Sequence, residues 1–131
     1  MITIKIDENP KSALEQMNIT AEPADTVMTV TERGELLGVG VMELHDEYAL
    51  LKGVYIKEEF DCFELEFGLA KSMLNAVDLK GIRCAVTDGI GSGRLITALR
   101  FKPSSECGRC EEYVTNRKYY LNLDGYFTAN C

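Results

Sequence analysis

Two of the five cysteines stand in a C-x-x-C motif, Cys107-Gly108-Arg109-Cys110, a spacing that both metal knuckles and redox pairs use. A structural zinc site usually takes four ligands, so Cys84, Cys131 or the only histidine, His45, would have to complete one. The motif lies in a polar segment and does not open a helix, as the redox pair of thioredoxin-like proteins does. The sequence therefore favours loop cysteines without a partner, and we assign no metal ligand.

His45 is the second residue that offers chemistry, because histidine is the side chain most often used as a general base. It stands in a turn among Glu43, Asp46 and Glu47. No serine or cysteine nucleophile is placed beside it by the sequence. We therefore interpret His45 as a solvated turn residue. The alternative is that Glu43, His45 or a water molecule acts as a general base.

A glycine-rich segment, Gly89-Ile90-Gly91-Ser92-Gly93, follows a predicted strand and invites comparison with a dinucleotide-binding loop. Its spacing is not G-x-G-x-x-G, and the helix after it is too short for a Rossmann unit. A flexible loop is the better interpretation.

Aromatic side chains also gather near the C-terminus, where we expect core packing, with an exposed subset able to form a homodimer contact. They are Tyr113, Tyr119, Tyr120, Tyr126 and Phe127.

Composition excludes several classes of function. The chain has 131 residues, 21 of them acidic against 14 basic, and a net charge of −7. An acidic protein is a poor ligand for nucleic acid or for an anionic membrane surface, both of which are bound through Lys and Arg. No apolar run approaches the ~18 residues of a membrane helix, and residues 1–7 alternate like a strand, unlike a signal peptide. We expect a cytoplasmic protein with free thiols.

The elements that position these residues follow from hydrophobic periodicity. The pattern predicts strands at residues 2–6, 26–32, 36–44, 48–56, 82–87, 113–114 and 118–123, and helices at 10–17, 62–80 and 94–99. Asn9 is expected to cap the first helix, and Asp61 the long one, with Glu64 as its capping-box partner. The strand–helix–strand order in the middle requires a parallel pair with a right-handed crossover. The fold class is therefore α/β (α+β), one domain over residues 1–131, with a mixed central sheet and helices on both faces.

This order of elements resembles that of the GNAT superfamily of acetyltransferases. The resemblance rests on the order itself, on an apolar strand that runs into a long helix (residues 49–79), and on residues 98–103, which look like the family's Leu-Gly-Phe ending after the short helix. It covers residues 26–101 well and the two ends loosely. The resemblance implies a cleft for acetyl-CoA and transfer of an acetyl group to an amine.

The loop that should hold the CoA pyrophosphate departs from the family pattern. In active members an Arg/Gln-x-x-Gly-x-Gly/Ala loop opens the long helix, and its backbone N–H groups bind the phosphates. Residues 56–66 contain no glycine, and Phe63 and Leu65 fall near the glycine positions. Lys57 is the one basic residue in this stretch. Five acids surround the site, and like charges at a surface cost about 1–3 kcal/mol each before screening. They are Glu58, Glu59, Asp61, Glu64 and Glu66.

Other positions of the family pattern also differ. The tyrosine that protonates the departing CoA thiolate in many members is matched by Ile96, and the glycine of the Leu-Gly-Phe ending is matched by Arg100. Residues 10–18 leave room for one short helix where the family usually has two. Gly53 marks either the bulge that the family carries in this strand or space for a neighbouring side chain, and the sequence favours neither.

The resemblance nevertheless implies a set of cofactor-binding residues. Main-chain groups of Val54, Tyr55 and Ile56 correspond to those that contact the acetyl and pantetheine groups. The helix start corresponds to the pyrophosphate site and consists of Phe63, Glu64 and Leu65. The resemblance implies no catalytic side chain in this sequence.

Two hypotheses for function follow. The first is a GNAT-fold protein with a degraded acetyl-CoA site, acting as a non-catalytic or atypical module that binds a small molecule or a protein partner. The second is an N-acetyltransferase that uses acetyl-CoA and an unknown amine. The acidic, glycine-free loop favours the first. A zinc-dependent regulator that uses the cysteines is a third and more distant possibility.

Overall fold

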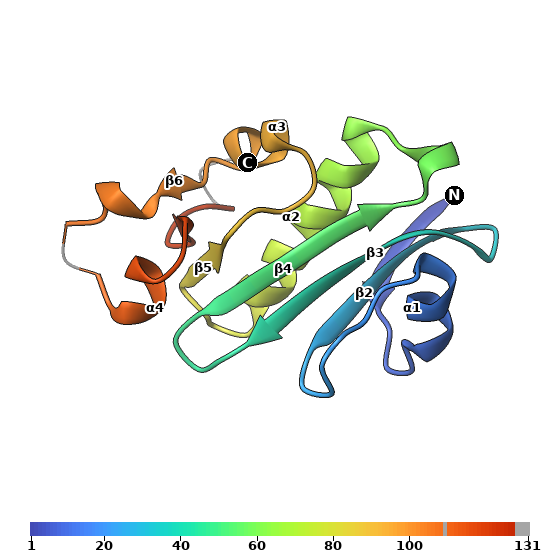
Figure 1. The fold of residues 1–131 in the computed structure, drawn as a ribbon, viewed down its shortest axis with the longest axis horizontal. Coiled ribbons are helices and arrows are strands. Elements are labelled where there is room, and N and C mark those ends of the chain that lie inside the picture. Colours follow the sequence, from blue (N-terminus) through green and yellow to red (C-terminus); the bar gives the residue numbers. More distant parts are fainter. Residues whose placement is uncertain (109, 128–131) are drawn as a thin grey trace.

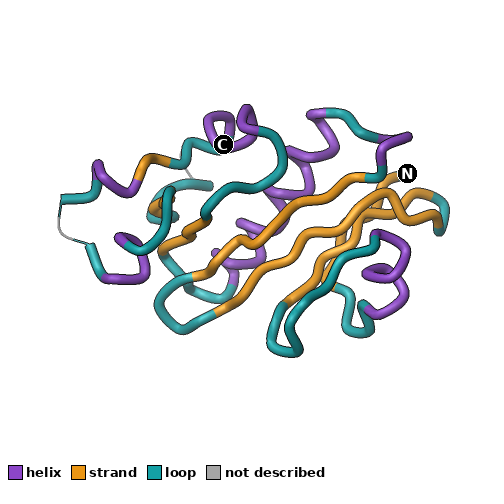
Figure 2. Tube along the Cα trace, viewed as in Figure 1, coloured by secondary structure: helices purple, strands orange, loops and turns teal. Residues whose placement is uncertain are grey.

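A computed structural model describes residues 1–108 and 110–127 of the chain. Within these residues, seven strands form one sheet in the order β1-β2-β3-β4-β5-β7-β6, with helices on both of its faces (Figures 1 and 2). The strands are β1 (Ile2–Ile6), β2 (Thr26–Glu32), β3 (Glu35–Leu44), β4 (Ala49–Ile56), β5 (Cys84–Thr87), β6 (Lys102–Pro103) and β7 (Tyr119–Asn122). The helices are α1 (Lys11–Met17), α2 (Phe63–Leu79), α3 (Gly93–Ala98) and α4 (Glu112–Thr115), with 3-10 turns η1 (Glu58–Phe60) and η2 (Ser104–Glu106).

The first four strands form an antiparallel meander, and β4 and β5 form the parallel pair that the sequence predicts. Helix α2 makes the crossover between β4 and β5, and Figure 1 shows it behind the sheet. The mixed sheet and the helices on both faces are confirmed. In the part of the chain that the structure describes, no helix combines the length and the apolar character needed to span a membrane.

The main core lies between the sheet and α2. The apolar stripe of α2 contributes Leu69, Met73, Leu74 and Val77, all fully buried, and β4 contributes Leu51. Burying a Leu, Met or Val side chain contributes roughly 1.5–3 kcal/mol, so this stripe holds the crossover against the sheet. The smaller core on the opposite face lies under α1. It comprises Ala13, Val27, Leu36, Val39 and Val41.

Helix ends differ in two places from the sequence-based expectation. Helix α2 begins after Cys62, whose side chain makes no capping hydrogen bond, while Asp61 ends the 3-10 turn η1. The turn η1 uses the residues before Asp61, which shifts the helix start by one residue and leaves no capping box. Helix α1 begins after Pro10, and the N–H of Asn9 donates to the Asp7 carboxylate at 3.0 Å, so the prediction of Asn9 as cap is also wrong.

The C-terminal third departs further from the predicted strands. Residues 113–114 belong to α4, a single turn that buries Val114 against Leu50 and Val86. A two-residue apolar pair has no periodicity that separates a strand from a helix turn. Residues 102–103, expected to be irregular, form β6 beside β7. The predicted strand at 118–123 is confirmed as β7, which lies between β5 and β6.

Candidate functional site

The parallel strands β4 and β5 separate after a short contact. They pair only at Ala49 with Ala85 and at Leu50 with Val86. The Thr87 hydroxyl donates a hydrogen bond to the Leu51 carbonyl oxygen at 2.7 Å, and this bond joins the two strands at the point where they separate. Beyond it β4 continues to Ile56, and no strand among the described residues pairs with its β5-facing edge (Figure 1). An open strand edge presents backbone N–H and C=O groups to a ligand.

A cavity of about 370 Å³ lies where the two strands part. Strand β3 pairs Val41 with Gly53 and Met42 with Leu51, so Lys52 is an extra residue that bulges from β4. Bulges redirect side chains, and this one brings Lys52 to the cavity wall. The cavity is lined by Glu43, Leu50, Leu51, Lys52, Asp88, Gly89 and Arg117.

Lys52 is the centre of a polar network beside this cavity. Its Nζ lies 2.8 Å from Oδ1 of Asp25 and 3.2 Å from Oε2 of Glu43. The Asp25 side chain is only 2% exposed, so the ammonium is its compensating charge. The hydrogen bond to Asp25 raises the pKa of Lys52, with a smaller contribution in the same direction from Glu43. Lys52 is therefore a charged, structural member of the wall at neutral pH.

Glu43 links the network to an aromatic stack. Its Oε1 hydrogen-bonds Nε2 of His45. The His45 ring stacks on Tyr48 with centroids 4.4 Å apart, and Tyr48 stacks on Tyr113 at 4.4 Å. The bond to His45, followed by the bond from Lys52, lowers the pKa of Glu43. His45 thus has defined partners and is more than a solvated turn residue.

The lowered pKa of Glu43 predicts a dependence of stability on pH. A carboxyl group with a depressed folded-state pKa contributes stability above its ordinary pKa of about 4.3 and loses it as the pH falls through the folded value. The free energy of unfolding should therefore fall less between neutral pH and about pH 3 in Glu43→Gln than in the wild type. The difference should be less than about 1 kcal/mol, because the carboxyl group is partly exposed. Urea unfolding from neutral pH to about pH 3 measures this difference. Glu112→Gln, at an exposed position, is the control. An equal loss of unfolding free energy at low pH in the wild type and in Glu43→Gln would contradict the stabilising role of the Glu43 carboxylate.

The far end of the open β4 edge meets the start of α2. Phe63, Glu64 and Leu65 form the first turn of α2, and no side chain caps it. Arg94 of α3 lies over the Phe63 ring, with its guanidinium carbon 4.0 Å from the ring centroid. Free first-turn N–H groups and a nearby guanidinium both favour an anion. No pattern in the sequence pointed to Arg94, which follows the glycine-rich segment on a separate short helix.

One of the five acids near this helix start faces inward. The Glu66 carboxylate accepts hydrogen bonds from the backbone N–H of Ser92 at 3.3 Å and from its hydroxyl at 2.8 Å. A Cβ on Gly91, whose φ is +53°, would lie 2.7 Å from the Glu66 carboxyl carbon. The glycine-rich segment therefore lets α2 hold the start of α3, and Glu66 does not count among the charges that face a phosphate.

Solved structures share the fold of this chain. The E. coli ribosomal-protein-S18-alanine N-acetyltransferase superposes with a TM-score of 0.70 at 13% identity, covering 94% of both chains. A Bacillus subtilis acetyltransferase in complex with CoA gives 0.68 at 14% identity, over 94% of this chain and 99% of that one. A GNAT family acetyltransferase from Elizabethkingia anophelis with acetyl-CoA bound gives 0.65 at 15%, over 93% and 98%. The chain has the GNAT acetyltransferase fold. No family model and no curated protein matches its sequence.

Of the residues expected to contact the cofactor, Val54, Tyr55 and Ile56 lie on the open edge of β4, whereas Glu64 and Leu65 line a separate cavity beside β1. Val54 is buried toward the core, while Tyr55 is 41% exposed and Ile56 is half-buried. A Cβ on Gly53 would lie 2.3 Å from the Tyr55 hydroxyl, so Gly53 makes room for that ring. It also borders the bulge at Lys52, so both interpretations of this glycine hold.

The other departures from the GNAT pattern have structural counterparts. Ile96, at the position of the family tyrosine, is buried in the core and offers no proton. Arg100, at the position of the family glycine, has φ +69°, the left-handed conformation that glycine adopts readily. The backbone turn after α3 is thus kept although the residue that makes it easy is absent.

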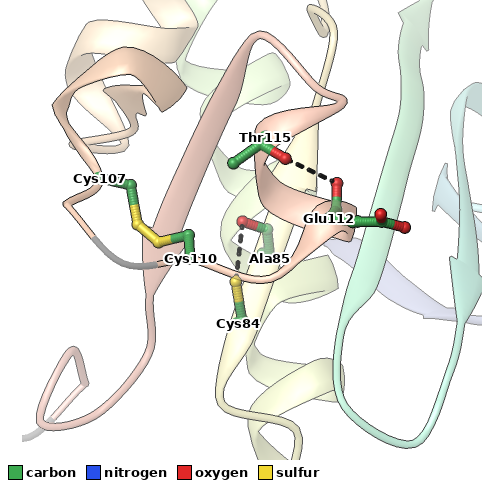
Figure 3. Close-up of a disulfide and its surroundings, with 6 residues drawn as sticks. All are labelled: Cys84, Ala85, Cys107, Cys110, Glu112 and Thr115. Carbon is green, nitrogen blue, oxygen red and sulfur yellow. Dashed lines mark hydrogen bonds between the residues drawn. A yellow bond between two sulfur atoms is a disulfide. The ribbon is translucent and has the colours of Figure 1, made fainter.

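The cysteines correct one expectation from the sequence. Cys107 and Cys110 form a disulfide, with Cα atoms 5.9 Å apart, so they are not free loop cysteines (Figure 3). The separation of the two Cα atoms lies within the usual range for such a bond. Cys62 and Cys84 are free, and Cys131 lies outside the described residues. No group of three or more His, Cys, Asp and Glu side chains within 1–108 and 110–127 is arranged to hold a metal ion.

Proposed function

We propose that the cleft between β4 and β5 binds a pantetheine thioester such as acetyl-CoA, and that the chain is a ligand-binding module rather than an efficient acetyltransferase. The observation that carries the proposal is the open edge of β4, which leads from the 370 Å³ cavity to the uncapped start of α2. The solved GNAT structures with acetyl-CoA or CoA bound support this choice of ligand.

Binding would use main-chain groups more than side chains. A pantetheine arm carries amides that can pair with the free edge of β4 over Val54, Tyr55 and Ile56, as an added strand would. The pyrophosphate would then meet the first turn of α2, with Arg94 beside it as a bidentate donor. Lys57, which hydrogen-bonds Gln16 at 3.5 Å, is a second cation before η1.

Two features reduce affinity and turnover. Glu58, Glu59, Asp61 and Glu64 are exposed around the start of α2 and oppose a doubly negative pyrophosphate. Buried Ile96 replaces the tyrosine that protonates the leaving thiolate in related enzymes, so transfer would lack general-acid assistance, which is worth roughly 10²–10⁴-fold. Weak binding with little transfer follows from these two features together.

A second candidate function, acetyl transfer to an amine, is favoured by the polar wall of the cavity. Glu43 is held ionised by its bonds with His45 and Lys52, and it lines the cavity where an acetyl group would lie. It can accept a proton from an incoming ammonium group, directly or through water. Holding the amine and the thioester close together would supply the remainder of the rate enhancement.

Calorimetric titration with acetyl-CoA at low salt tests the proposed ligand. We expect a dissociation constant of about 0.1–1 mM, equivalent to about 4–5.5 kcal/mol of binding free energy. Arg94→Ala should weaken binding about five- to tenfold, because one charge-assisted contact is lost. Arg83→Ala, an arginine at the opposite end of β5, is the matched control and should bind as the wild type does.

Two results would change the conclusion. The absence of heat and of thermal stabilisation at millimolar acetyl-CoA would overturn the proposed ligand. Rapid release of CoA thiol in the presence of an amine library would favour the enzyme over the binding module. Loss of that release in Glu43→Gln would identify Glu43 as its base.

A further inference from the structure

A second cavity, away from the cleft, gathers cysteines from two distant segments of the chain. It has a volume of about 510 Å³ and lies between the start of β5 and residues 107–114. Cys84, at the start of β5, lines it together with Cys107 and Cys110. The three side chains also pack on one apolar cluster, formed by Leu50, Val86 and Val114. The fold thus brings the C-x-x-C motif to the one free cysteine of β5 (Figure 3).

Cys84 packs on the same apolar cluster as the two cysteines of the motif and lines the same cavity. A cation in that cavity would therefore meet sulfur atoms from both segments of the chain. A divalent metal ion deprotonates the thiols that coordinate it.

We propose that, once a dithiol or phosphine reductant has converted the Cys107–Cys110 disulfide to two thiols, the chain binds a single Zn²⁺ ion through Cys84, Cys107 and Cys110, whose thiol protons pass to solvent. The two-residue spacing of the motif is that of a zinc knuckle, and Cys84 supplies a third sulfur from the cavity wall. Water or a carboxylate completes the tetrahedron, and Glu111 and Asp124 both line the cavity. In the disulfide form two of the three sulfurs are bonded to each other, and the described residues contain no group of three side chains arranged to hold a metal ion.

Titration of the full, phosphine-reduced chain under anaerobic conditions tests this site. Co²⁺ serves as the spectroscopic probe, since thiolate ligands give it an intense charge-transfer absorption, and Zn²⁺ should displace it. We expect one ion per chain and release of protons as each thiol becomes a ligand. The oxidised chain, with its disulfide intact, should show no charge-transfer absorption.

Single substitutions then locate the ligands. Cys84→Ser and Cys110→Ser should each lower Zn²⁺ affinity by about 100-fold or more, since losing a ligand costs more than the 10–100-fold of an outer-shell partner. Cys62→Ser, an exposed free cysteine near the start of α2, is the matched control and should leave the affinity unchanged. Circular dichroism checks that each variant remains folded.

The proposal is overturned if the reduced wild type shows no thiolate charge-transfer absorption with Co²⁺. It is equally overturned if Cys84→Ser binds as the wild type does, since the ion would then not use the cavity. If Cys84→Ser fails to fold, the test uses the thermal stability of the wild-type chain. A rise with Zn²⁺ that occurs only after reduction of the disulfide supports the site, and the absence of a rise refutes it.

Discussion

Replacing Glu58, Glu59 and Glu64 together by lysine is expected to tighten acetyl-CoA binding by at least about tenfold, or ~1.4 kcal/mol. All three side chains are exposed around the uncapped first turn of α2. The repulsion between each carboxylate and a pyrophosphate is about 1–3 kcal/mol before solvent and salt screen it. Removing a small fraction of the summed repulsion is therefore enough for this gain in affinity. The three ammonium groups would also attract the pyrophosphate directly, beside the N–H groups of the first turn that bind it.

Calorimetry at low and high salt measures this gain. The improvement should shrink as salt is added, because exposed charges are screened beyond about 10 Å at 0.1 M. The matched control reverses three exposed glutamates that lie away from the start of α2, namely Glu47, Glu106 and Glu112. It carries the same change in net charge, so a similar gain in that control, or no gain in the test variant, would show that the acidic loop does not limit CoA binding.

Lys52→Met is expected to lower the free energy of unfolding by about 2–3 kcal/mol. Removing the ammonium leaves the Asp25 carboxylate, 2% exposed, without its compensating charge and takes one partner from Glu43. The cost lies toward the lower end of values for a broken buried pair, because Lys52 itself is 27% exposed. Methionine keeps the length and the apolar stem of the side chain, so packing changes little.

A double variant separates the charge effect from packing. Asp25→Asn in the Lys52→Met background removes the stranded charge and should recover about half of the lost stability. Urea unfolding followed by far-ultraviolet circular dichroism gives the three free energies. A loss below about 0.5 kcal/mol in Lys52→Met, within the range of an ordinary surface substitution, would show that the network does not stabilise the fold.

The elements that build the cleft were predictable because they rest on local periodicity. The apolar stripe of residues 63–79 and the nearly all-apolar stretch of residues 49–56 each define an element without reference to the rest of the chain. Their order then requires the parallel crossover between β4 and β5. The residues expected to contact a cofactor came from the resemblance to the GNAT pattern and not from this order.

The polar details of the site were not predictable, because they join segments that are distant in the sequence. Asp25, Glu43 and Lys52 come from a loop and two strands, and the bulge that turns Lys52 toward the cavity leaves no mark in the pattern. Arg94 reaches α2 from another helix. The start of α2 was misplaced by one residue because Asp61 is a good cap by type, whereas η1 uses it to end a turn.

The position of β7 has a consequence for how the protein is made. Residues 119–122 lie between β5 and β6, two strands that precede them in the chain. During synthesis the β1–β4 meander can form as soon as it leaves the ribosome, since its strands pair with their immediate neighbours. Strand β6 cannot pair with the sheet until β7 emerges, so this end of the sheet forms late. Nascent chains halted before residue 119 would therefore leave the edge of β5 open to pairing with strands of other chains.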